Sequence, residues 1–419
     1  MERRCLVVIP LSKVLYRYGF SAPLGYLFGG RSHLVHGVFS KDLTSDLVAG
    51  YQYFIVELNW VTELFEFHLI VDFIRKYNAN AKILFGGLFS QLHYETIFRS
   101  CAVDLFIRGD NELPLRLFLE GEALRKIPNL VSRDGASESS YTLLPEEFKG
   151  IEFDIEWFPS YKALFSPLSG CTDLPETYDT AVSEITNNQL TRDEMFYSFP
   201  LIVTTKKCSV IHAGCDYCMG SKSLPFQNTA AYSNDALISV LRGLEKKGGD
   251  VYGKVCLYIL NDIALYDFSN VSFDMNVFIE YDGALGRQAL GPRADRGRLY
   301  NLEKLFHAFR GGICRLPAST AGLHDRSRDI DYAGIIKRLE TARHRIKFML
   351  YEDDSPAIAS MGLDSRHVEC TLDNFDYRGK LRFDTYASFA QSLVTSIELY
   401  NSTKINEQFN LNRVLEYTD

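Results

Sequence analysis

Short β-rich runs alternate with helical stretches along the first 135 residues, and this alternation constrains the fold more than any other feature. The predicted strands are residues 5–10, 33–39, 53–59, 82–85 and 103–108. Residues 64–77 and 112–119 carry apolar side chains at helical spacing. Strand–helix alternation predicts a parallel, doubly wound sheet that binds its ligand beyond the carboxyl ends of the strands.

Glycines follow two of these predicted strands. Gly86 and Gly87 follow the fourth strand, and Gly109 follows the fifth. Glycine at such positions lets a ligand approach the backbone closely. Residues 127–135 then form a small predicted β-turn segment that closes a first domain at residues 1–135.

The periodicity weakens over residues 136–199, which we interpret as a linker that makes contacts with its neighbours. A second α/β region follows, with predicted strands at residues 201–205, 255–260, 273–280, 312–316, 345–351 and 367–372. Predicted helices between them cover residues 234–246, 302–309 and 332–343. This βα repeat predicts an open or closed barrel over residues 200–386, followed by a C-terminal extension at 387–419.

Composition excludes several classes of protein. A net charge of −8 and a pI of about 5.7 give no cationic field for nucleic acid. The apolar run near the start is too short for a signal sequence, and no stretch approaches the ~20 residues that cross a bilayer. We therefore expect a cytoplasmic protein that binds neither nucleic acid nor membrane.

Nine scattered cysteines without secretory features argue against a disulfide framework. Six of the nine are isolated in the sequence and are predicted to be small buried hydrophobic residues: Cys5, Cys101, Cys171, Cys256, Cys314 and Cys370.

The other three cysteines, Cys208, Cys215 and Cys218, lie close together just after the strand predicted at 201–205. Three thiolates can bind three irons of a 4Fe–4S cube and leave the fourth iron open to a substrate or cofactor. A structural zinc site with His212 as its fourth ligand is an alternative, as is a cluster of cysteines without a metal.

The cysteine segment resembles the cluster motif of radical S-adenosylmethionine enzymes, in which three cysteines follow the first strand of a partial (βα)6 barrel. Tyr217 stands where that family commonly has an aromatic residue that packs beside the adenine of S-adenosylmethionine. Gly220, in Met219-Gly220-Ser221, resembles the continuation in the cobalamin-binding branch. The cysteines are separated by six residues and then two, where the family usually has three and then two.

The first domain resembles the cobalamin domain of the same branch, in order, at residues 22–25, 86–87, 103–112 and 127–135. The resemblance therefore implies an α/β chain with an N-terminal Rossmann-like cobalamin-binding-type domain, followed by a partial (βα)6 radical S-adenosylmethionine barrel. The segment expected to face the corrin is Glu57, Leu58, Asn59 and Trp60, at the end of the third strand, and Gly86, Gly87 and Gly109 are also expected to lie at the cobalamin. The motif Asp-x-His-x-x-Gly is absent from residues 1–135, so cobalamin would lack its histidine ligand. The alternative is a scaffold domain that holds no cofactor.

By the same resemblance, the open iron would chelate S-adenosylmethionine, and reduction would generate a 5′-deoxyadenosyl radical. Candidate residues that would hydrogen-bond S-adenosylmethionine or substrate, or would instead be turn residues or helix caps, are Asn261, Asp262, Glu280 and Ser319.

The favoured reaction is methyl transfer to an sp³ or phosphinate centre of a small specialised metabolite, with an electron donor such as flavodoxin or ferredoxin. Radical rearrangement or redox chemistry without methylation is the second candidate. A non-catalytic, metal-stabilised binding protein is the third. No residue is assigned a catalytic role.

Overall fold

The computed structural model describes residues 2–10, 27–28, 30–59, 63–149, 201–203, 205–206, 230–248, 254–259, 266–281, 304–305, 307–318, 344–350 and 368–370. These residues form two large sheets, each with a run of parallel strands, so the protein is of the α/β class. None of the helices in this part of the chain is long and apolar enough to cross a membrane.

The first sheet has seven strands in the order β2-β1-β3-β4-β5-β6-β7. The five parallel strands are β1 (Cys5–Ile9), β2 (Val35–Phe39), β3 (Tyr53–Glu57), β4 (Lys82–Gly86) and β5 (Leu105–Ile107). Two short antiparallel strands, β6 (Leu130–Ser132) and β7 (Gly135–Ala136), extend the sheet beyond β5. The order 2-1-3-4-5 is one of the two common doubly wound topologies, and its ligand site lies where the chain switches direction, between β1 and β3.

The sequence predictions for this sheet are confirmed, with small differences at the strand ends. The strand predicted at 33–39 begins later, because Ser32–Leu34 form the 3-10 turn η1. A second 3-10 turn, η2 (Ser40–Asp42), follows β2.

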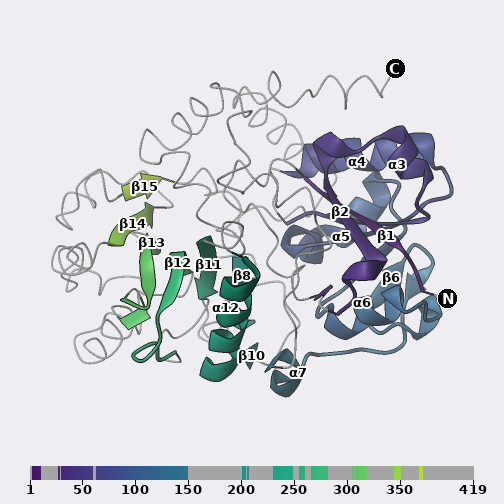
Figure 1. Ribbon diagram of the computed structural model, residues 1–419. Coiled ribbons are helices and arrows are strands. Elements are labelled where there is room, and N and C mark those ends of the chain that lie inside the picture. Colours follow the sequence, from purple (N-terminus) through teal and green to yellow (C-terminus); the bar gives the residue numbers. More distant parts are fainter. Residues whose placement is uncertain are drawn as a thin grey trace.

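Alternate side chains of the parallel strands point to opposite faces of the first sheet. One face, with Leu6, Phe54 and Phe85, packs against helices α3 (Ser45–Ala49), α4 (Leu64–Tyr77) and α5 (Leu88–Ser100). The other face meets α6 (Glu112–Leu119), where the rings of Tyr53 and Phe118 lie 5.7 Å apart. Figure 1 shows these elements in purple and blue, with the N-terminus beside them.

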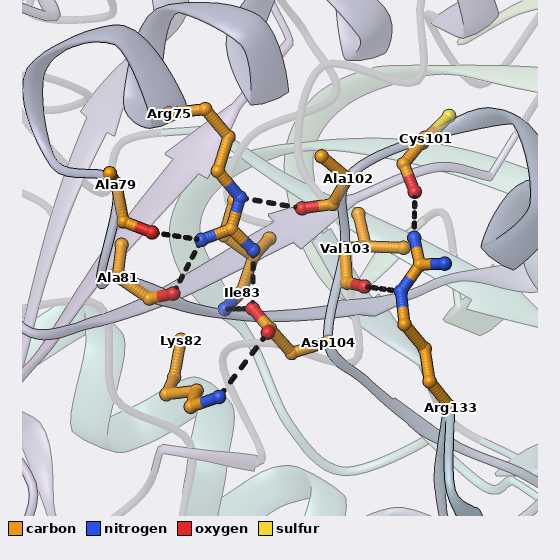
Figure 2. A network of polar contacts seen from close by, with 10 residues as sticks. All are labelled: Arg75, Ala79, Ala81, Lys82, Ile83, Cys101, Ala102, Val103, Asp104 and Arg133. Carbon is orange, nitrogen blue, oxygen red and sulfur yellow. Dashed lines mark hydrogen bonds and ion pairs between the residues drawn. The ribbon is translucent and has the colours of Figure 1, made fainter.

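A polar network ties down the amino ends of β4 and β5, at the edge of the sheet opposite the carboxyl ends of the strands (Figure 2). The Arg75 guanidinium, at the end of α4, binds the Asp104 carboxylate at 2.5 Å. Asp104 also accepts a hydrogen bond from the Ile83 amide at 2.8 Å. Arg75 donates in addition to three backbone carbonyls, those of Ala79, Ala81 and Ala102. The network therefore joins α4 to the loops that begin both strands.

The second sheet has six parallel strands whose spatial order follows the sequence: β8 (Leu201–Val203), β11 (Lys254–Ile259), β12 (Phe273–Tyr281), β13 (Phe309–Ala318), β14 (His344–Leu350) and β15 (Val368–Cys370). All six correspond to predicted strands. Sequential order in a parallel sheet is what a repeated βα unit produces.

One helix of the second region is described over its whole length, α12 (Asn234–Gly248). Its buried residues Leu237, Leu241 and Leu244 recur at helical spacing. The helix predicted at 302–309 is wrong at its end, because Phe309 already opens β13 and pairs with Phe273. The helix predicted at 332–343 lies outside the described residues.

Candidate functional site

The carboxyl ends of β3, β4 and β5 carry most of the residues that the sequence predicts to face a corrin. Leu58 and Asn59 follow β3, Gly86 ends β4, Gly87 follows it, and Gly109 lies two residues after β5. We call these five residues the carboxyl edge. Parallel pairing brings them to the same side of the sheet, beside the switch point between β1 and β3. Glu57, also predicted, is the last residue of β3, and Trp60 lies outside the described residues.

Leu58 and the two glycines interlock. The Leu58 amide donates to the Gly86 carbonyl at 2.7 Å, continuing the β3–β4 ladder by one residue. Gly87 has φ +113, and a Cβ there would stand 2.4 Å from the Leu58 carbonyl oxygen. Glycine is therefore required at 87 by the crossing of two backbone segments, independently of any ligand.

Gly86 differs from its neighbour. A Cβ on Gly86 would meet no atom within 4 Å, so the carboxyl edge has open room beside the end of β4. Room for a group above the last strand residue is what a ligand lying across the strand ends needs.

Two buried carboxylates orient Asn59. The backbone N–H of Asn59 donates to Glu63 Oε2 at 2.7 Å, and its side-chain Nδ2 donates to Glu57 Oε1 at 3.2 Å. Glu57 and Glu63 are 5% and 0% exposed, respectively. Hydrogen bonds to buried carboxylates are among the stronger polar contacts in a protein, so Asn59 is held in one orientation at the edge.

Two polar side chains in the first turn of α5 form hydrogen bonds with the backbone of the carboxyl edge. Ser90 Oγ lies 3.2 Å from both the Leu58 and the Gly86 carbonyl oxygens. Gln91 Nε2 donates to the Ile107 carbonyl at 3.1 Å, and Gln91 Oε1 accepts from the Gly109 amide at 2.9 Å. One glutamine therefore pairs both with the last residue of β5 and with the glycine beyond it.

Sequence reasoning did not find Glu63, Ser90 or Gln91. The last two belong to α5, whose apolar periodicity is weaker than that of α4 or α6, and which the sequence patterns do not predict. The available signal was the polar pair Ser90-Gln91 in the first turn after Gly86-Gly87, where a helix that begins at a strand end would place polar side chains beside that strand end.

A histidine is buried on the same helix. His93 is 5% exposed, and its ring lies 4.6 Å from that of Phe89. Burial lowers the pKa of His93 to about 4, so the imidazole is neutral at pH 7.

Beyond β5, the chain that follows β7 is bound back to this region. Asp110, next to Gly109 and fully buried, accepts from the Leu143 amide at 2.8 Å. Asn129 exchanges two hydrogen bonds with the Tyr141 backbone, at 2.9 and 2.8 Å. Burial and then the nearby Glu112 carboxylate raise the pKa of Tyr141, so its hydroxyl stays protonated. The domain boundary at residue 135 stays a prediction.

The cysteine segment lies between two short paired strands. β9 (Thr205–Lys206) follows β8, and it pairs antiparallel with β10 (Ala230–Ala231), with Lys206 opposite Ala230 and Thr205 opposite Ala231. We call this pair the closing ladder. The predicted cluster ligands and their neighbours fall inside the interval 207–229, outside the described residues: Cys208, Cys215, Tyr217, Cys218 and Gly220.

The remaining predicted residues belong to the second sheet. Glu280 lies in β12, one residue before its end, opposite Tyr258 of β11 and Arg315 of β13. Asn261, Asp262 and Ser319 lie outside the described residues, although β11 and β13 end just before them, at Ile259 and Ala318.

No group of three or more His, Cys, Asp and Glu side chains that could hold a metal ion exists among the residues that the structure describes. Cys5 and Cys101, two of the six isolated cysteines, are buried as predicted.

No protein-family model and no curated protein matches the chain. Solved structures that are similar to it include the radical S-adenosylmethionine methyltransferase TsrM from Kitasatospora setae with cobalamin and a [4Fe-4S] cluster bound, at 9% identity and a TM-score of 0.41. That match covers 83% of this chain and 74% of TsrM. The cobalamin-dependent S-adenosylmethionine radical enzyme OxsB with aqua-cobalamin bound matches at 12% identity and a TM-score of 0.49, over 93% of this chain and 56% of OxsB. At these values the likeness assigns no activity to the chain.

Proposed function

We propose that the chain is a radical S-adenosylmethionine enzyme that also binds cobalamin and transfers a methyl group to a small specialised metabolite. Cys208, Cys215 and Cys218 would hold a 4Fe–4S cluster, and the carboxyl edge of the first sheet would hold the corrin. When bound, the cluster and S-adenosylmethionine supply the radical chemistry and cobalamin supplies the methyl group.

One observation carries the proposal: the cysteine segment follows, in the sequence, the carboxyl end of β8, the first strand of a six-stranded parallel sheet. Ligands of such sheets lie beyond the carboxyl ends of the strands. The closing ladder pairs Lys206 with Ala230, the described residues on either side of the interval 207–229, and it follows β8 in the sequence. Three thiolates are a donor set that suits iron and leaves one iron open.

The first domain supports the cobalamin part. Its doubly wound sheet has room beside Gly86, and it holds Asn59 in a fixed orientation at the same edge. A corrin laid across these strand ends would contact backbone atoms and the Asn59 amide. The edge would then position the ring and shield one of its faces from water.

The experiment that tests the proposal is anaerobic reconstitution of the full chain with iron and sulfide, followed by addition of S-adenosylmethionine, reductant and hydroxocobalamin. Iron, zinc, bound corrinoid and 5′-deoxyadenosine are measured in the wild type, in Cys215→Ala, and in the matched control Cys171→Ala. We expect iron and 5′-deoxyadenosine to be lost in Cys215→Ala only. Bound zinc in place of iron would overturn the proposal and leave a metal-stabilised binding protein.

A second pair of variants separates the two cofactors. Gly86→Ala and Gly86→Val progressively fill the room beside β4, so the corrinoid should bind more weakly with each step while the iron content stays that of the wild type. 5′-Deoxyadenosine formation without any corrinoid in the wild-type protein would keep the radical enzyme and remove methyl transfer.

A further inference from the structure

A short helix, α7 (Pro145–Lys149), lies against the closing ladder in Figure 1. The contact is aromatic: the rings of Phe148 on α7 and Tyr232, the residue after β10, lie 4.8 Å apart. Phe148 is 2% exposed and Tyr232 is 3% exposed. Two aromatic residues from distant parts of the sequence are therefore fully packed where α7 meets the closing ladder.

On the first-domain side, the segment that leads into α7 is hydrogen-bonded to Asp110, the residue after Gly109 of the carboxyl edge. Asp110 binds the Leu143 amide, and Asn129 binds both backbone groups of Tyr141, as described above. Glu147 of α7 then accepts from the Leu144 amide at 2.8 Å and from the Tyr141 hydroxyl at 3.1 Å. These bonds run without a gap from Asp110, next to Gly109, to the helix that carries Phe148.

On the other side, Tyr232 is fixed between two elements. It directly follows Ala231, which pairs with Thr205 in the closing ladder. It directly precedes Ser233, whose Oγ accepts from the Ala236 amide at 3.2 Å and begins α12. A shift of Tyr232 must therefore move the closing ladder, because both of its neighbours are hydrogen-bonded, Ala231 within the ladder and Ser233 at the start of α12.

We propose that Phe148 and Tyr232 are positioning residues, which hold the closing ladder of the cysteine segment in a fixed place relative to the carboxyl edge of the first sheet. The role of the three cysteines rests on the proposed function. The coupling between Asn129 and the ladder rests on the contacts above and holds whatever metal the cysteines bind.

The packing energy of an aromatic pair sets the size of the expected effect. An aromatic contact contributes about 1 kcal/mol beyond its buried area, so its loss should raise local opening of the ladder about fivefold. Hydrogen exchange of the backbone amides, followed by mass spectrometry on the full chain without cofactors, reads this opening directly in peptides that cover 205–206 and 230–231.

Two variants and a control test whether the contacts from Asn129 through α7 to Tyr232 hold the ladder in place. Phe148→Leu removes the ring, and Asn129→Gly removes the side-chain bonds to Tyr141 while keeping the left-handed backbone that Asn129 adopts at φ 61. The matched control is Phe268→Leu, a ring that is 1% exposed and packs on Phe273 and Phe309 instead. We expect the first two to speed exchange in the ladder, and the control to leave ladder exchange at the wild-type rate.

Rescue by a conservative variant separates positioning from general loss of packing. Tyr232→Phe keeps the ring and should keep wild-type exchange in the ladder, whereas Tyr232→Leu should match Phe148→Leu, and the double variant should add nothing to either. Equal exchange in Phe148→Leu and wild type, or equal acceleration in Phe268→Leu, would overturn the proposal. Since no cofactor is present, this outcome is independent of whether the cysteines bind iron.

Discussion

The Leu58 carbonyl oxygen occupies the space that a side chain on Gly87 would need, with only 2.4 Å between that oxygen and an added Cβ. The same backbone segment donates from the Leu58 amide to the Gly86 carbonyl. Two strand ends are thus interlocked at the carboxyl edge, and the interlock depends on a glycine with a positive φ.

Gly87→Ala should therefore destabilise the protein. The new methyl group forces Leu58 away and places alanine in a backbone region that is essentially restricted to glycine, which costs at least about 2 kcal/mol. Denaturant unfolding of the full chain, followed by the circular dichroism of its helices, measures the loss of unfolding free energy.

The matched control is the neighbouring glycine. Gly86→Ala adds the same methyl group where no atom lies within 4 Å. Its unfolding free energy should stay within about 1 kcal/mol of the wild type. Equal destabilisation by both substitutions would show that the interlock with Leu58 is not the reason for glycine at 87.

The sequence predicts those parts of the fold and of the carboxyl edge whose signal lies within a single helix or strand. Helices α4 and α6 have the predicted bounds, because their apolar residues recur at the helical period. Gly87 and Gly109 follow their strands as predicted, whereas Gly86 is the last residue of β4. Ser90 and Gln91 were missed, because a polar side chain in a weakly periodic segment becomes informative only when folding brings it to another element.

The network in Figure 2 leads to a second prediction, which concerns stability alone. Asp104→Asn removes the charge that binds Arg75. Because both side chains are only 21% exposed, Arg75 would stay largely buried without its partner. An uncompensated, largely buried guanidinium should cost about 2–3 kcal/mol of unfolding free energy. Urea unfolding at pH 7 measures it, and the corrinoid binding proposed for the opposite edge should not change in native conditions.

Lys82 provides the control for this network. Its ammonium also reaches Asp104, at 3.4 Å, but its side chain is 51% exposed. Lys82→Gln should therefore cost less than about 1 kcal/mol. If Lys82→Gln were as costly as Asp104→Asn, the burial of the Arg75 pair would not explain its strength.

A third prediction follows from His93. Its pKa is about 4 in the folded chain and about 6.5 when unfolded, so between these values the unfolded state binds more protons. Stability should consequently fall as the pH drops through this window, and His93 should account for about 2 kcal/mol of the loss between pH 7 and pH 5.

Comparison with His93→Leu isolates that contribution, because all other groups titrate in both proteins. The wild type should lose more unfolding free energy than the variant between pH 7 and pH 5. Parallel pH profiles would mean that His93 titrates normally in the folded state.

The last prediction concerns which thiols can react. Burial raises the pKa of both Cys5 and Cys101 to about 12, so almost no thiolate forms on either at pH 8. His68 Nε2 lies 3.2 Å from Cys101 Sγ, but burial lowers the pKa of His68 as well, so the imidazole is neutral and does not stabilise a thiolate.

Native alkylation with iodoacetamide should therefore spare Cys5 and Cys101 and modify them only in denaturant. In the proposed function, Cys208, Cys215 and Cys218 react in the apo-protein and become protected together after reconstitution with iron and sulfide, because thiolates that ligate iron cannot attack the reagent. Peptide mass spectrometry gives the modified fraction at each cysteine. Six residues separate Cys208 from Cys215, where the family usually has three, so the role of Cys208 needs its own test. Protection of Cys215 and Cys218 without Cys208 would assign the third iron ligand to another residue. Rapid native labelling of Cys101 would instead contradict the burial of its thiol against His68.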